Sequence, residues 1–477
     1  MGFEFERVLP QSVGVDPQGV IDFIDSLKQK AVNMHSFMLV RRGKVAAECY
    51  YKPFAAGMLH NIYSVSKNIT SAAVGLAISD GLIRLDDKIV DFFPEKIQGH
   101  NIHPYTRAMT VEHLLKMATV HPKSTDTSGD DWIKGFLTAP PVKMPGMSFA
   151  YDTTGTHTLC GIIQKVTGKA VNEYLREKLF DKIGIGEIEW ITCPMGINVG
   201  GGGIKMTTED MAKFGQLYLN MGVCGGEQVL PREWVIKSTS RQIDNTNASF
   251  MLDGRTGYGY KFWLGRHNSY ICFGMGGQFI IVVPEKELVF VTTANTKQAS
   301  DGHQLILDSF WDVLYPAIGD GTPQAAAEAN ARLDKIAGSL EMHIPDGKST
   351  SPAAEIANGK AFAADENAAG YKSLVFGFDG QYGSLTLSSE KAQHKFSFKL
   401  CGWQEAKSPF ADENAFCSGV WTDEKTLIIN LQLKERMQML TAYCHFEGGS
   451  AVVQISAAGG FVPEFSPYCG WVNCHMQ

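Results

Sequence analysis

The sequence predicts an α+β fold, in which helices flank an antiparallel sheet and a helical subdomain is inserted into it, followed by a small all-β domain. Three observations predict this fold. Residues 36–51 and 278–294 each resemble a pair of strands, and the stretch between them has helical periodicity. Residues 371–477 return to short alternating strands separated by turn residues. Strands that enclose a run of helices indicate one sheet with a helical insertion.

The two strand pairs carry the residues that strands prefer. In 36–51, alternating apolar residues flank a turn at Arg42 and Gly43. In 278–294, two runs rich in β-branched and aromatic residues flank the charged residues 285–287. We expect these strands to form the sheet and to supply its edges, because they come from the two ends of the same region.

Helical spacing is clearest in residues 65–80. Apolar side chains recur there about every 3.6 residues, and Gly81 follows as a stop signal. Residues 207–220 begin with two threonines, either of which can cap a helix, and acidic residues follow in the first turn. Further helices are predicted at 157–167, 170–180 and 302–317.

The chain of 477 residues is too long for one ordinary core, so more than one domain is expected. We expect a first domain over 1–318 and a β-rich domain over 371–477. Residues 319–370 are Ala-rich and then small and polar, which predicts a linker with one helix. The C-terminal domain is a candidate for covering a cleft or for mediating oligomerisation.

Composition excludes several classes of function. The net charge of -7, without a Lys/Arg cluster, argues against nucleic-acid binding. No run reaches the roughly 18–20 apolar residues of a membrane helix. The first residues lack the cationic and apolar pattern of a signal peptide, so a cytoplasmic location is expected. The ten cysteines form no C-x-x-C pair, which predicts free thiols and no metal site.

The first chemical motif is Ser64-x-x-Lys67 at the start of the helix predicted over 65–80. Residues three apart share one face of a helix, so both side chains point the same way. A serine hydroxyl needs a base to become a nucleophile, and a buried lysine can serve if its pKa falls toward about 7–8. The helix N-terminus also offers backbone N–H groups beside Ser64, where an oxyanion would form.

Two further segments add to this motif. Tyr151 follows a turn and an extended piece, just before a helix, and could relay a proton to a leaving group. We expect Lys67 to favour its phenolate, and Asp152 to be a turn or cap residue. The segment 272–278 is glycine-rich and precedes an apolar hairpin, and residues 200–203 are four consecutive glycines. Glycines at a strand edge let a substrate approach the backbone, which could offer a second oxyanion donor.

Together these segments resemble the serine β-lactamase-like hydrolases, which include class C β-lactamases, D-alanyl-D-alanine carboxypeptidases and related esterases and amide hydrolases. The similarity extends in order over roughly residues 8–318. The segments that carry it are IYSVSKNITSAAVGLAISDGLIRLDDKIVDFFPE, PGMSFAYDTTGTHTLCGIIQKVTGKAVNEYLREKLFDKIGI, GGGGIKMTTEDMAKFGQLYLN, YGYKFW and FGMGGQFIIVVPEKELVFVTTAN. The region 371–477 resembles β-rich appendages of some members.

The resemblance implies a role for each matching position. Ser64 matches the acylated nucleophile, Lys67 the lysine that shares its proton, and Tyr151 the tyrosine that acts as base and then as acid. The oxyanion donors would be the backbone N–H groups of Ser64 and Met275. No cofactor and no metal are implied, because Lys67 and Tyr151 supply the proton transfers.

Departures from the family pattern bear on the substrate. Thr153 stands where the tyrosine motif usually has Asn or Ser, so it can donate only through a hydroxyl. Segment 272–274 stands where Lys-Thr-Gly or His-x-Gly is usual, so the cation that grips a carboxylate is absent from that motif. An ester or small amide therefore fits better than a β-lactam. The residues expected to bind substrate are Thr153, Cys272, Phe273, Gly274 and Gly276.

Two alternatives stay open. One is a D-amino-acid peptidase, a penicillin-binding protein or a β-lactamase that acts through the same serine. The other is a binding or scaffold protein that kept the fold and lost efficient turnover, which the departures at Thr153 and Cys272 would explain. A burst with an activated ester, lost on Ser64→Ala, would separate an enzyme from a scaffold.

Overall fold

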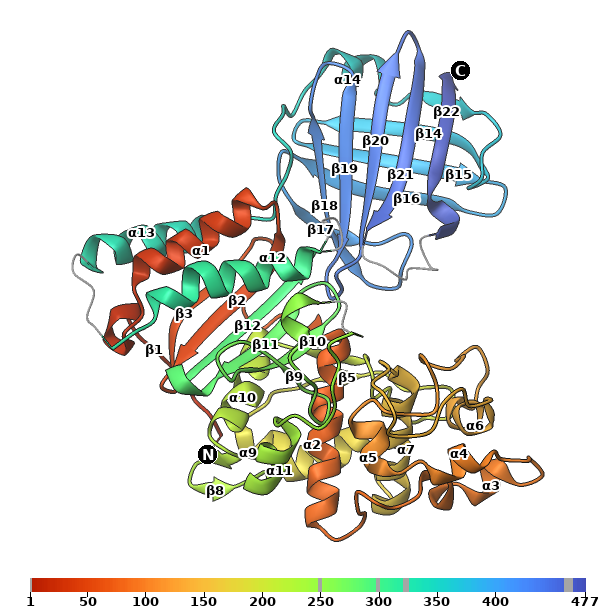
Figure 1. Ribbon diagram of the computed structural model, residues 1–477. Helices are drawn as coiled ribbons and strands as arrows, with labels where there is room; N and C mark the ends of the chain where they lie inside the picture. Colours follow the sequence, from red (N-terminus) through yellow and green to blue (C-terminus); the bar gives the residue numbers. More distant parts are fainter. Residues whose placement is uncertain (1, 248–250, 297–300, 321–325, 459–465) are drawn as a thin grey trace.

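The computed structural model describes residues 2–247, 251–296, 301–320, 326–458 and 466–477. The N-terminal region is built on a seven-stranded sheet in the order β1-β3-β2-β12-β11-β10-β9 (Figure 1). All neighbouring strands are antiparallel except β1 and β3. The strands are β1 (Glu6–Arg7), β2 (Asn33–Arg41), β3 (Lys44–Tyr50), β9 (Trp263–Leu264), β10 (Tyr270–Gly274), β11 (Gln278–Val283) and β12 (Leu288–Asn295).

The two predicted hairpins are present, but their place in the sheet differs from the prediction. The strands β2 and β12 pair with each other in the middle of the sheet, with Leu39 opposite Phe290, whereas β1 and β9 form the edges. The prediction that the hairpins supply the edges was therefore wrong. The physical reason is burial, since every residue of β12 is buried and a strand covered on both faces belongs in the centre.

Helices cover both faces of this sheet. On one face, α1 (Pro17–Gln29), α12 (Gly302–Ser309) and α13 (Ala326–Ser339) enclose a core that includes Phe37 and Leu39. On the other face, α2 (Ser66–Ser79) and α10 (Thr208–Leu219) share a second core with Met38 and Val40. Successive side chains of β2 thus point into opposite cores, because side chains alternate between the two faces of a strand.

The helical insertion lies below the sheet in Figure 1 and carries a small three-stranded sheet in the order β4-β6-β5. Its main helix, α7 (Thr153–Thr167), begins four residues before the predicted start because Asp152 caps it. The other elements are α3 (Pro94–Ile97), α4 (Pro104–Ala108), α5 (Val111–Leu115), α6 (Trp132–Thr138), α8 (Val171–Leu175), α9 (Asp181–Ile183), α11 (Arg232–Ser238), β4 (His60–Asn61), β5 (Glu189–Trp190), β6 (Ile204–Met206), β7 (Val223–Cys224) and β8 (Glu227–Gln228).

Two predicted helices are interrupted. The helix predicted over 170–180 is α8 followed by a π-helical turn at Arg176–Phe180. The helix predicted over 302–317 ends as α12 at Ser309, and a π-helical turn and a 3-10 turn follow it, Phe310–Leu314 and Tyr315–Ala317. In contrast, the helix predicted over 207–220 is present as α10, and Thr207 caps it as expected.

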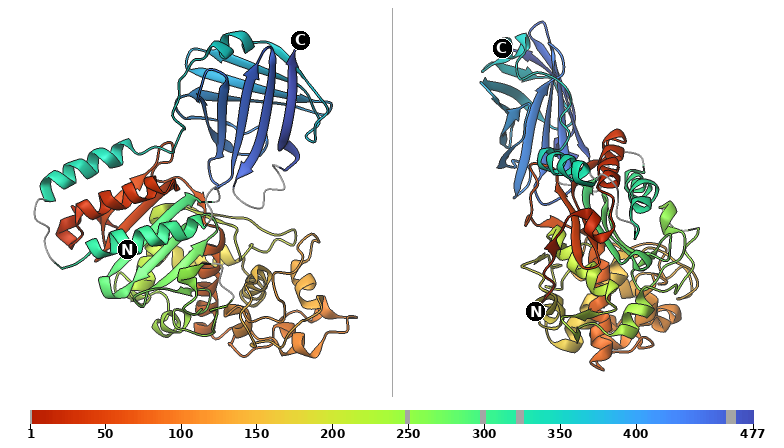
Figure 2. Two further views of the ribbon diagram at one scale, coloured as in Figure 1. Left: turned by 45° about the horizontal axis from the view of Figure 1, so that its top comes forward. Right: turned by 90° about the vertical axis from the view of Figure 1, so that its left-hand side faces the viewer.

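The C-terminal region is all-β, as predicted. Ten strands follow the order β16-β15-β14-β13-β22-β21-β20-β19-β18-β17, and an added pairing of β16 with β18 closes them into a barrel (Figure 2). They are β13 (Ala361–Ala364), β14 (Tyr371–Asp379), β15 (Tyr382–Ser389), β16 (Gln393–Leu400), β17 (Gln404–Lys407), β18 (Asn414–Trp421), β19 (Thr426–Leu433), β20 (Met439–Glu447), β21 (Ser450–Ala458) and β22 (Gly470–Met476). A hydrophobic core fills the barrel. Residues 319–370, which were predicted as a linker with one helix, instead contain two helices, α13 and α14 (Pro352–Ala357), and the strand β13. The helix α13 packs on the first sheet and β13 pairs within the barrel, so these residues belong largely to the two domains.

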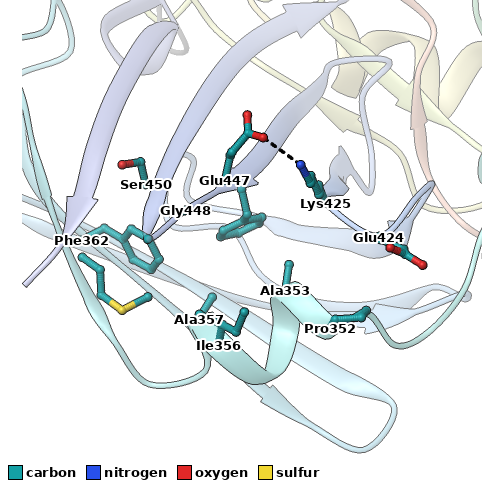
Figure 3. A pocket seen from close by; sticks show the side chains of 13 residues that line it. Pro352, Ala353, Ile356, Ala357, Phe362, Glu424, Lys425, Glu447, Gly448 and Ser450 are labelled. Carbon is teal, nitrogen blue, oxygen red and sulfur yellow. Dashed lines mark hydrogen bonds and ion pairs between the residues drawn. The ribbon is translucent and has the colours of Figure 1, made fainter.

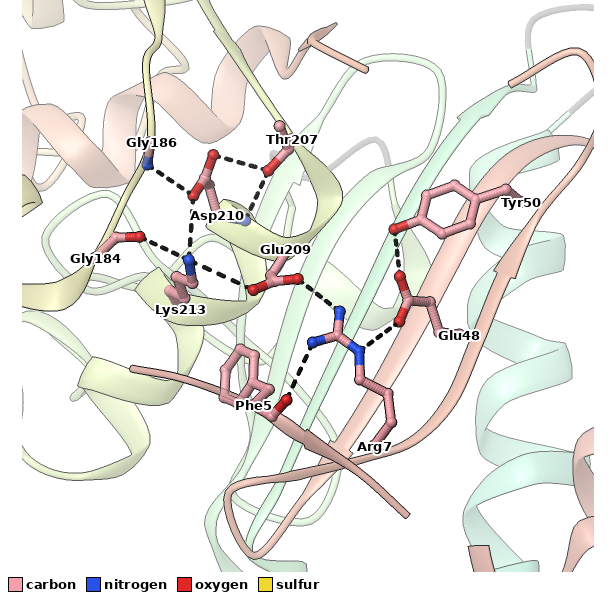
Figure 4. Close-up of polar contacts among 10 residues, drawn as sticks. All are labelled: Phe5, Arg7, Glu48, Tyr50, Gly184, Gly186, Thr207, Glu209, Asp210 and Lys213. Carbon is pink, nitrogen blue, oxygen red and sulfur yellow. Dashed lines mark hydrogen bonds and ion pairs between the residues drawn. The ribbon is translucent and has the colours of Figure 1, made fainter. Parts of the chain in front are cut away.

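A network of ion pairs fixes the N-terminal strand to the rest of the sheet (Figure 4). Arg7 on β1 donates to Glu48 on β3 at 3.0 Å and to Glu209 on α10 at 2.6 Å. The hydroxyl of Tyr50 donates to Glu48 at 2.8 Å, and Lys213 lies within 3.5 Å of Glu209. Opposite charges are thus matched around Arg7, which makes this cluster a structural clamp.

The cysteines and the helices bear on two further expectations from the sequence. The structure forms no disulfide among the ten cysteines, all of which lie in its described residues. Within the described residues, no helix combines the length and the apolar character that crossing a membrane requires.

Candidate active site

Ser64 lies in a single 3-10 turn, Tyr63–Val65, that leads directly into α2. The preceding Tyr63 has a φ of 47°, in the left-handed region that non-glycine residues rarely adopt. The side-chain oxygen of Asn61 accepts a hydrogen bond from the backbone N–H of Tyr63 at 2.9 Å and holds this turn. Ser64 is half-buried, so its hydroxyl sits at a protected position that solvent still reaches.

Lys67 faces Ser64 from the first turn of α2, as the three-residue spacing predicts. Its Nζ donates to Ser64 Oγ at 3.0 Å and to the carbonyl oxygen of Gly201 at 2.5 Å. The side chain is 1% exposed, and no carboxylate among the described residues forms an ion pair with it. Burial lowers the pKa of Lys67 to about 7, against a smaller opposing effect of the Asp152 charge. A large fraction of this lysine is therefore neutral at physiological pH.

Tyr151 completes the cluster from the loop before α7. Its ring centroid lies 4.9 Å from Lys67 Nζ, and the ring stacks on Trp263 with centroids 5.8 Å apart. Burial raises the pKa of Tyr151, and a hydrogen bond with Ser64 opposes part of that shift. The expectation that Lys67 favours the phenolate was therefore wrong. Because burial dominates, the phenol keeps its proton at neutral pH.

The N-terminus of α7 holds Tyr151 in place. Asp152, which is fully buried, caps α7 by accepting from the backbone N–H of Gly155 at 3.0 Å, so the predicted cap is confirmed. It also accepts from the hydroxyls of Thr119 and Thr154, each at 2.8 Å. Because these hydrogen bonds fix Asp152, the preceding residue, Tyr151, has little freedom to move.

Thr153 is half-buried and packs its methyl group against the glycine loop 200–203. A Cβ placed on Gly201 would lie 2.3 Å from Thr153 Cγ2, so only glycine fits there. The backbone N–H of Thr153 donates to Ser124 Oγ at 2.7 Å. This close approach is what brings the Gly201 carbonyl to Lys67. Gly201 therefore serves a packing need beside the lysine.

The end of β10 runs beside the nucleophile turn. A Cβ on Gly274 would lie 2.2 Å from the carbonyl oxygen of Ile62, two residues before Ser64. Met275 follows as a half-exposed residue, and its carbonyl accepts from Gln278 Nε2 at 2.9 Å. Gly276 then turns with a φ of 87°. The structure thus brings this backbone segment next to Ser64.

The side chains of the two residues before Gly274 point elsewhere. Cys272 is 1% exposed in one sheet core, and Phe273 is 5% exposed in the other, where it stacks on Phe279. Alternation along the strand sends them to opposite faces. Only their backbone is therefore available to a substrate at this edge.

Sequence reasoning missed Lys261, a second lysine buried near Lys67. It is 1% exposed and adopts a φ of 75°. Its Nζ donates to the carbonyl oxygen of Leu114 at 2.6 Å and lies 3.4 Å from Met117 Sδ. Burial, with the charge of Lys67, lowers the pKa of Lys261. Its aromatic neighbours in the sequence were the one available sign of burial.

An apolar cavity of roughly 200 Å³ lies in the barrel domain, between α14 and the turn that joins β20 to β21 (Figure 3). Phe362 and Phe446 line it, and an ion pair between Lys425 and Glu447 borders it. None of the predicted site residues lines this cavity. Across the described ranges, no three His, Cys, Asp or Glu side chains are grouped so that they could hold a metal ion.

The chain is similar to several known proteins. The 6-aminohexanoate-dimer hydrolase of Paenarthrobacter ureafaciens is 27% identical over 219 residues, which cover 42% of this chain. The chain spans 55% of the length of that relative. Two solved structures share the fold at low identity. A penicillin-binding protein homologue from Caulobacter crescentus (15% identity, TM-score 0.51) covers 63% of this chain and 99% of its own.

The second solved structure, SurE (17% identity, TM-score 0.52), covers 88% of this chain and 97% of its own. Its coverage is larger than that of the penicillin-binding protein homologue, so the likeness extends beyond the N-terminal region. The family model described as Beta-lactamase matches residues 23–308, a range that includes every residue of the cluster around Ser64. The chain belongs to the Beta-lactamase family.

Proposed function

We propose that this protein is a serine hydrolase that cleaves an ester or a small amide through an acyl-enzyme on Ser64. One observation carries the proposal. Lys67, whose pKa is lowered to about 7, donates to Ser64 Oγ at 3.0 Å from a fully buried position. A neutral amine at that distance can accept the hydroxyl proton, which is what a serine nucleophile requires.

Acylation follows from the protonation states of the two neighbours. Ser64 Oγ attacks the substrate carbonyl while its proton passes to neutral Lys67. The tetrahedral intermediate collapses as the phenol of Tyr151, which burial keeps in its protonated form, gives its proton to the leaving oxygen or nitrogen. Lys67, now an ammonium ion 4.9 Å from the Tyr151 ring centroid, returns a proton to the phenolate. Water then cleaves the ester bond to Ser64 by the reverse sequence.

The developing oxyanion needs two donors. We assign them to the backbone N–H groups of Ser64 and Met275, because the end of β10 lies against the turn that carries Ser64. Donors fixed in a backbone need no reorganisation during the reaction, so they stabilise the transition state efficiently. Gly274 supports this assignment, since a side chain there would push the strand away from Ile62.

The substrate preference rests on the residues around Ser64. Thr153 offers a hydroxyl, and the segment from Gly274 to Gly276 brings a backbone without a cationic side chain beside the turn that carries Ser64. Cys272 and Phe273 contribute through their backbone alone, because both side chains are buried. A small ester or amide without a carboxylate fits these residues. The relative named as a 6-aminohexanoate-dimer hydrolase supports the small size and the amide bond of such a substrate, whereas the dimer in that name carries a carboxylate.

In this proposal, the hydrolase domain comprises residues 1–318 together with α13, and the β-domain comprises residues 371–477 together with α14 and β13. The linker is therefore the shorter segment between α13 and α14. The test uses p-nitrophenyl butyrate, with turnover measured by absorbance and the covalent state by intact-mass spectrometry. The wild type should release p-nitrophenol and carry a transient butyryl adduct that Ser64→Ala lacks. A lasting penicillin adduct would favour a penicillin-binding peptidase, and the absence of any adduct or turnover would favour a scaffold protein.

A further inference from the structure

A loop of the barrel domain reaches the turn that carries Ser64. Residues 434–438 connect β19 to β20, and we call them the 434–438 loop. The backbone N–H of Asn61 donates to the carbonyl oxygen of Glu435 at 2.7 Å, and the Glu435 carboxylate pairs with Lys205 on β6. The loop is therefore tied to both strands that lead into the site.

The same loop forms hydrogen bonds with Tyr63, the residue next to the nucleophile. The phenolic oxygen of Tyr63 accepts from the backbone N–H of Met437 at 3.2 Å, and its hydroxyl donates to Gln438 Oε1 at 2.9 Å. Because the hydroxyl group of Tyr63 forms two hydrogen bonds with the 434–438 loop, the loop has a fixed position relative to Ser64. A side chain that the loop carries can therefore act as a rigid wall.

Met437 is that side chain. It is completely buried, and a Cβ placed on Gly276 would lie 2.3 Å from its sulfur. Gly276 directly follows Met275, whose N–H we assign to the oxyanion site. The Met437 thioether thus covers the backbone at the end of β10, one residue beyond the point where a substrate carbonyl would dock.

We propose that Met437 is a specificity-determining residue that bounds the acyl side of the site and excludes long acyl chains. The inference rests on the proposed function and deepens it by naming the substrate class, short-chain acyl esters and amides. A substrate whose carbonyl oxygen meets Met275 turns its leaving group toward Tyr151, which protonates it. The inference places the acyl chain along Gly276, where the Met437 sulfur is the atom nearest to that backbone position.

The experiment measures kcat/KM for p-nitrophenyl acetate, butyrate and octanoate with the full-length protein. The variants are Met437→Ala, the milder Met437→Val, and Met439→Ala as the matched control. Met439 is also a buried methionine, two residues further along on β20, but none of the three atoms nearest to a Cβ on Gly276 belongs to it. A fluorophosphonate adduct on Ser64, measured by intact mass, reports whether each variant keeps a competent site.

We expect Met437→Ala to raise the octanoate-to-acetate ratio of kcat/KM by about tenfold or more, since one methylene of pocket space changes selectivity by about that factor. Met437→Val should give a smaller rise, and Met439→Ala should leave the ratio within about twofold. An unchanged ratio in Met437 variants that still label would overturn the inference, as would an equal rise in Met439→Ala. A wild type that is never labelled would instead contradict the proposed function itself, and this inference with it.

Discussion

Two cations of this protein, Lys67 beside the nucleophile and Arg7 in the N-terminal clamp, meet opposite environments. Lys67 is 1% exposed, and its hydrogen-bond acceptors in the described part of the chain are the uncharged oxygens of Ser64 and Gly201. Arg7 is about half exposed and lies between the carboxylates of Glu48 and Glu209 (Figure 4). Burial lowers the pKa of Lys67 to about 7, whereas the hydrogen bond to Glu209 is the main cause that raises the pKa of Arg7.

The difference shows how one fold builds a clamp and a reactive site from similar residues. A charge matched by carboxylates stays charged and holds elements together. A lysine enclosed without a carboxylate partner loses its proton easily and can act as a base. This contrast leads to predictions that differ for the two regions.

The largest expected effect is on activity at Ser64. Ser64→Ala should lower kcat/KM for p-nitrophenyl butyrate by at least about 10³-fold, because removing the nucleophile disables the whole proton-transfer unit. The thermal midpoint should change little, since one half-buried hydroxyl is lost. The release of p-nitrophenol, followed by absorbance, gives kcat/KM, and differential scanning calorimetry gives the thermal midpoint. Residual turnover close to the wild-type rate would contradict a role for this serine.

Lys67 should be needed as a neutral amine. Lys67→Met and Lys67→Arg should both lower kcat/KM by about 10²- to 10⁴-fold, the usual contribution of a general base. Arginine keeps the charge but cannot lose its proton near neutral pH, so it separates basicity from charge. Lys213→Met, which removes a lysine of the clamp, is the matched control and should retain activity. An active Lys67→Arg variant would show that the charge is what matters.

The fold could be predicted where local pattern decides it. The spacing of Ile69, Ala72 and Leu76 places α2, and the turn at Arg42 and Gly43 places the first hairpin. The pairing of β2 with β12 could not be predicted, because strands about 250 residues apart carry no local signal of their partner.

The candidate site shows the same limit. The three-residue spacing of Ser64 and Lys67 is local and places the two side chains together. The burial of Lys261 and the approach of Met437 to Gly276 could not be predicted in this way, because they depend on segments more than 100 residues away. The raised pKa of Tyr151 likewise depends on the packing around it.

Stability should depend on pH at Lys67. An unfolded lysine has a pKa of about 10.4, so the folded state holds Lys67 with fewer protons between about pH 7 and 10.4. The cost of burying its charge is complete below pH 7 and vanishes as the pH rises to about 10.4. Lys67→Met should therefore raise the thermal midpoint more at pH 6 than at pH 9. A gain that does not depend on pH would contradict the lowered pKa.

The clamp should give the smallest effect. Arg7→Met should reduce the free energy of unfolding by about 1 kcal/mol, because partly exposed ion pairs each contribute about 0.2–1 kcal/mol. The pH dependence of kcat/KM should not change, since Arg7 lies outside the site. Urea unfolding measures the loss, and Arg84→Met, which removes a more exposed arginine paired with Asp86 and Asp87, provides the comparison. A loss of activity in Arg7→Met would mean that the two regions are coupled.

The most direct test of the central claim is the rate at which a fluorophosphonate labels the protein between pH 5 and 9, followed by intact-mass spectrometry. We predict one adduct, on Ser64, with a rate that rises with pH and reaches half of its maximum near pH 7, where Lys67 loses its proton. Labelling of another residue, or a Ser64 labelling rate that does not change across this range, would contradict the account of a serine activated by a neutral lysine.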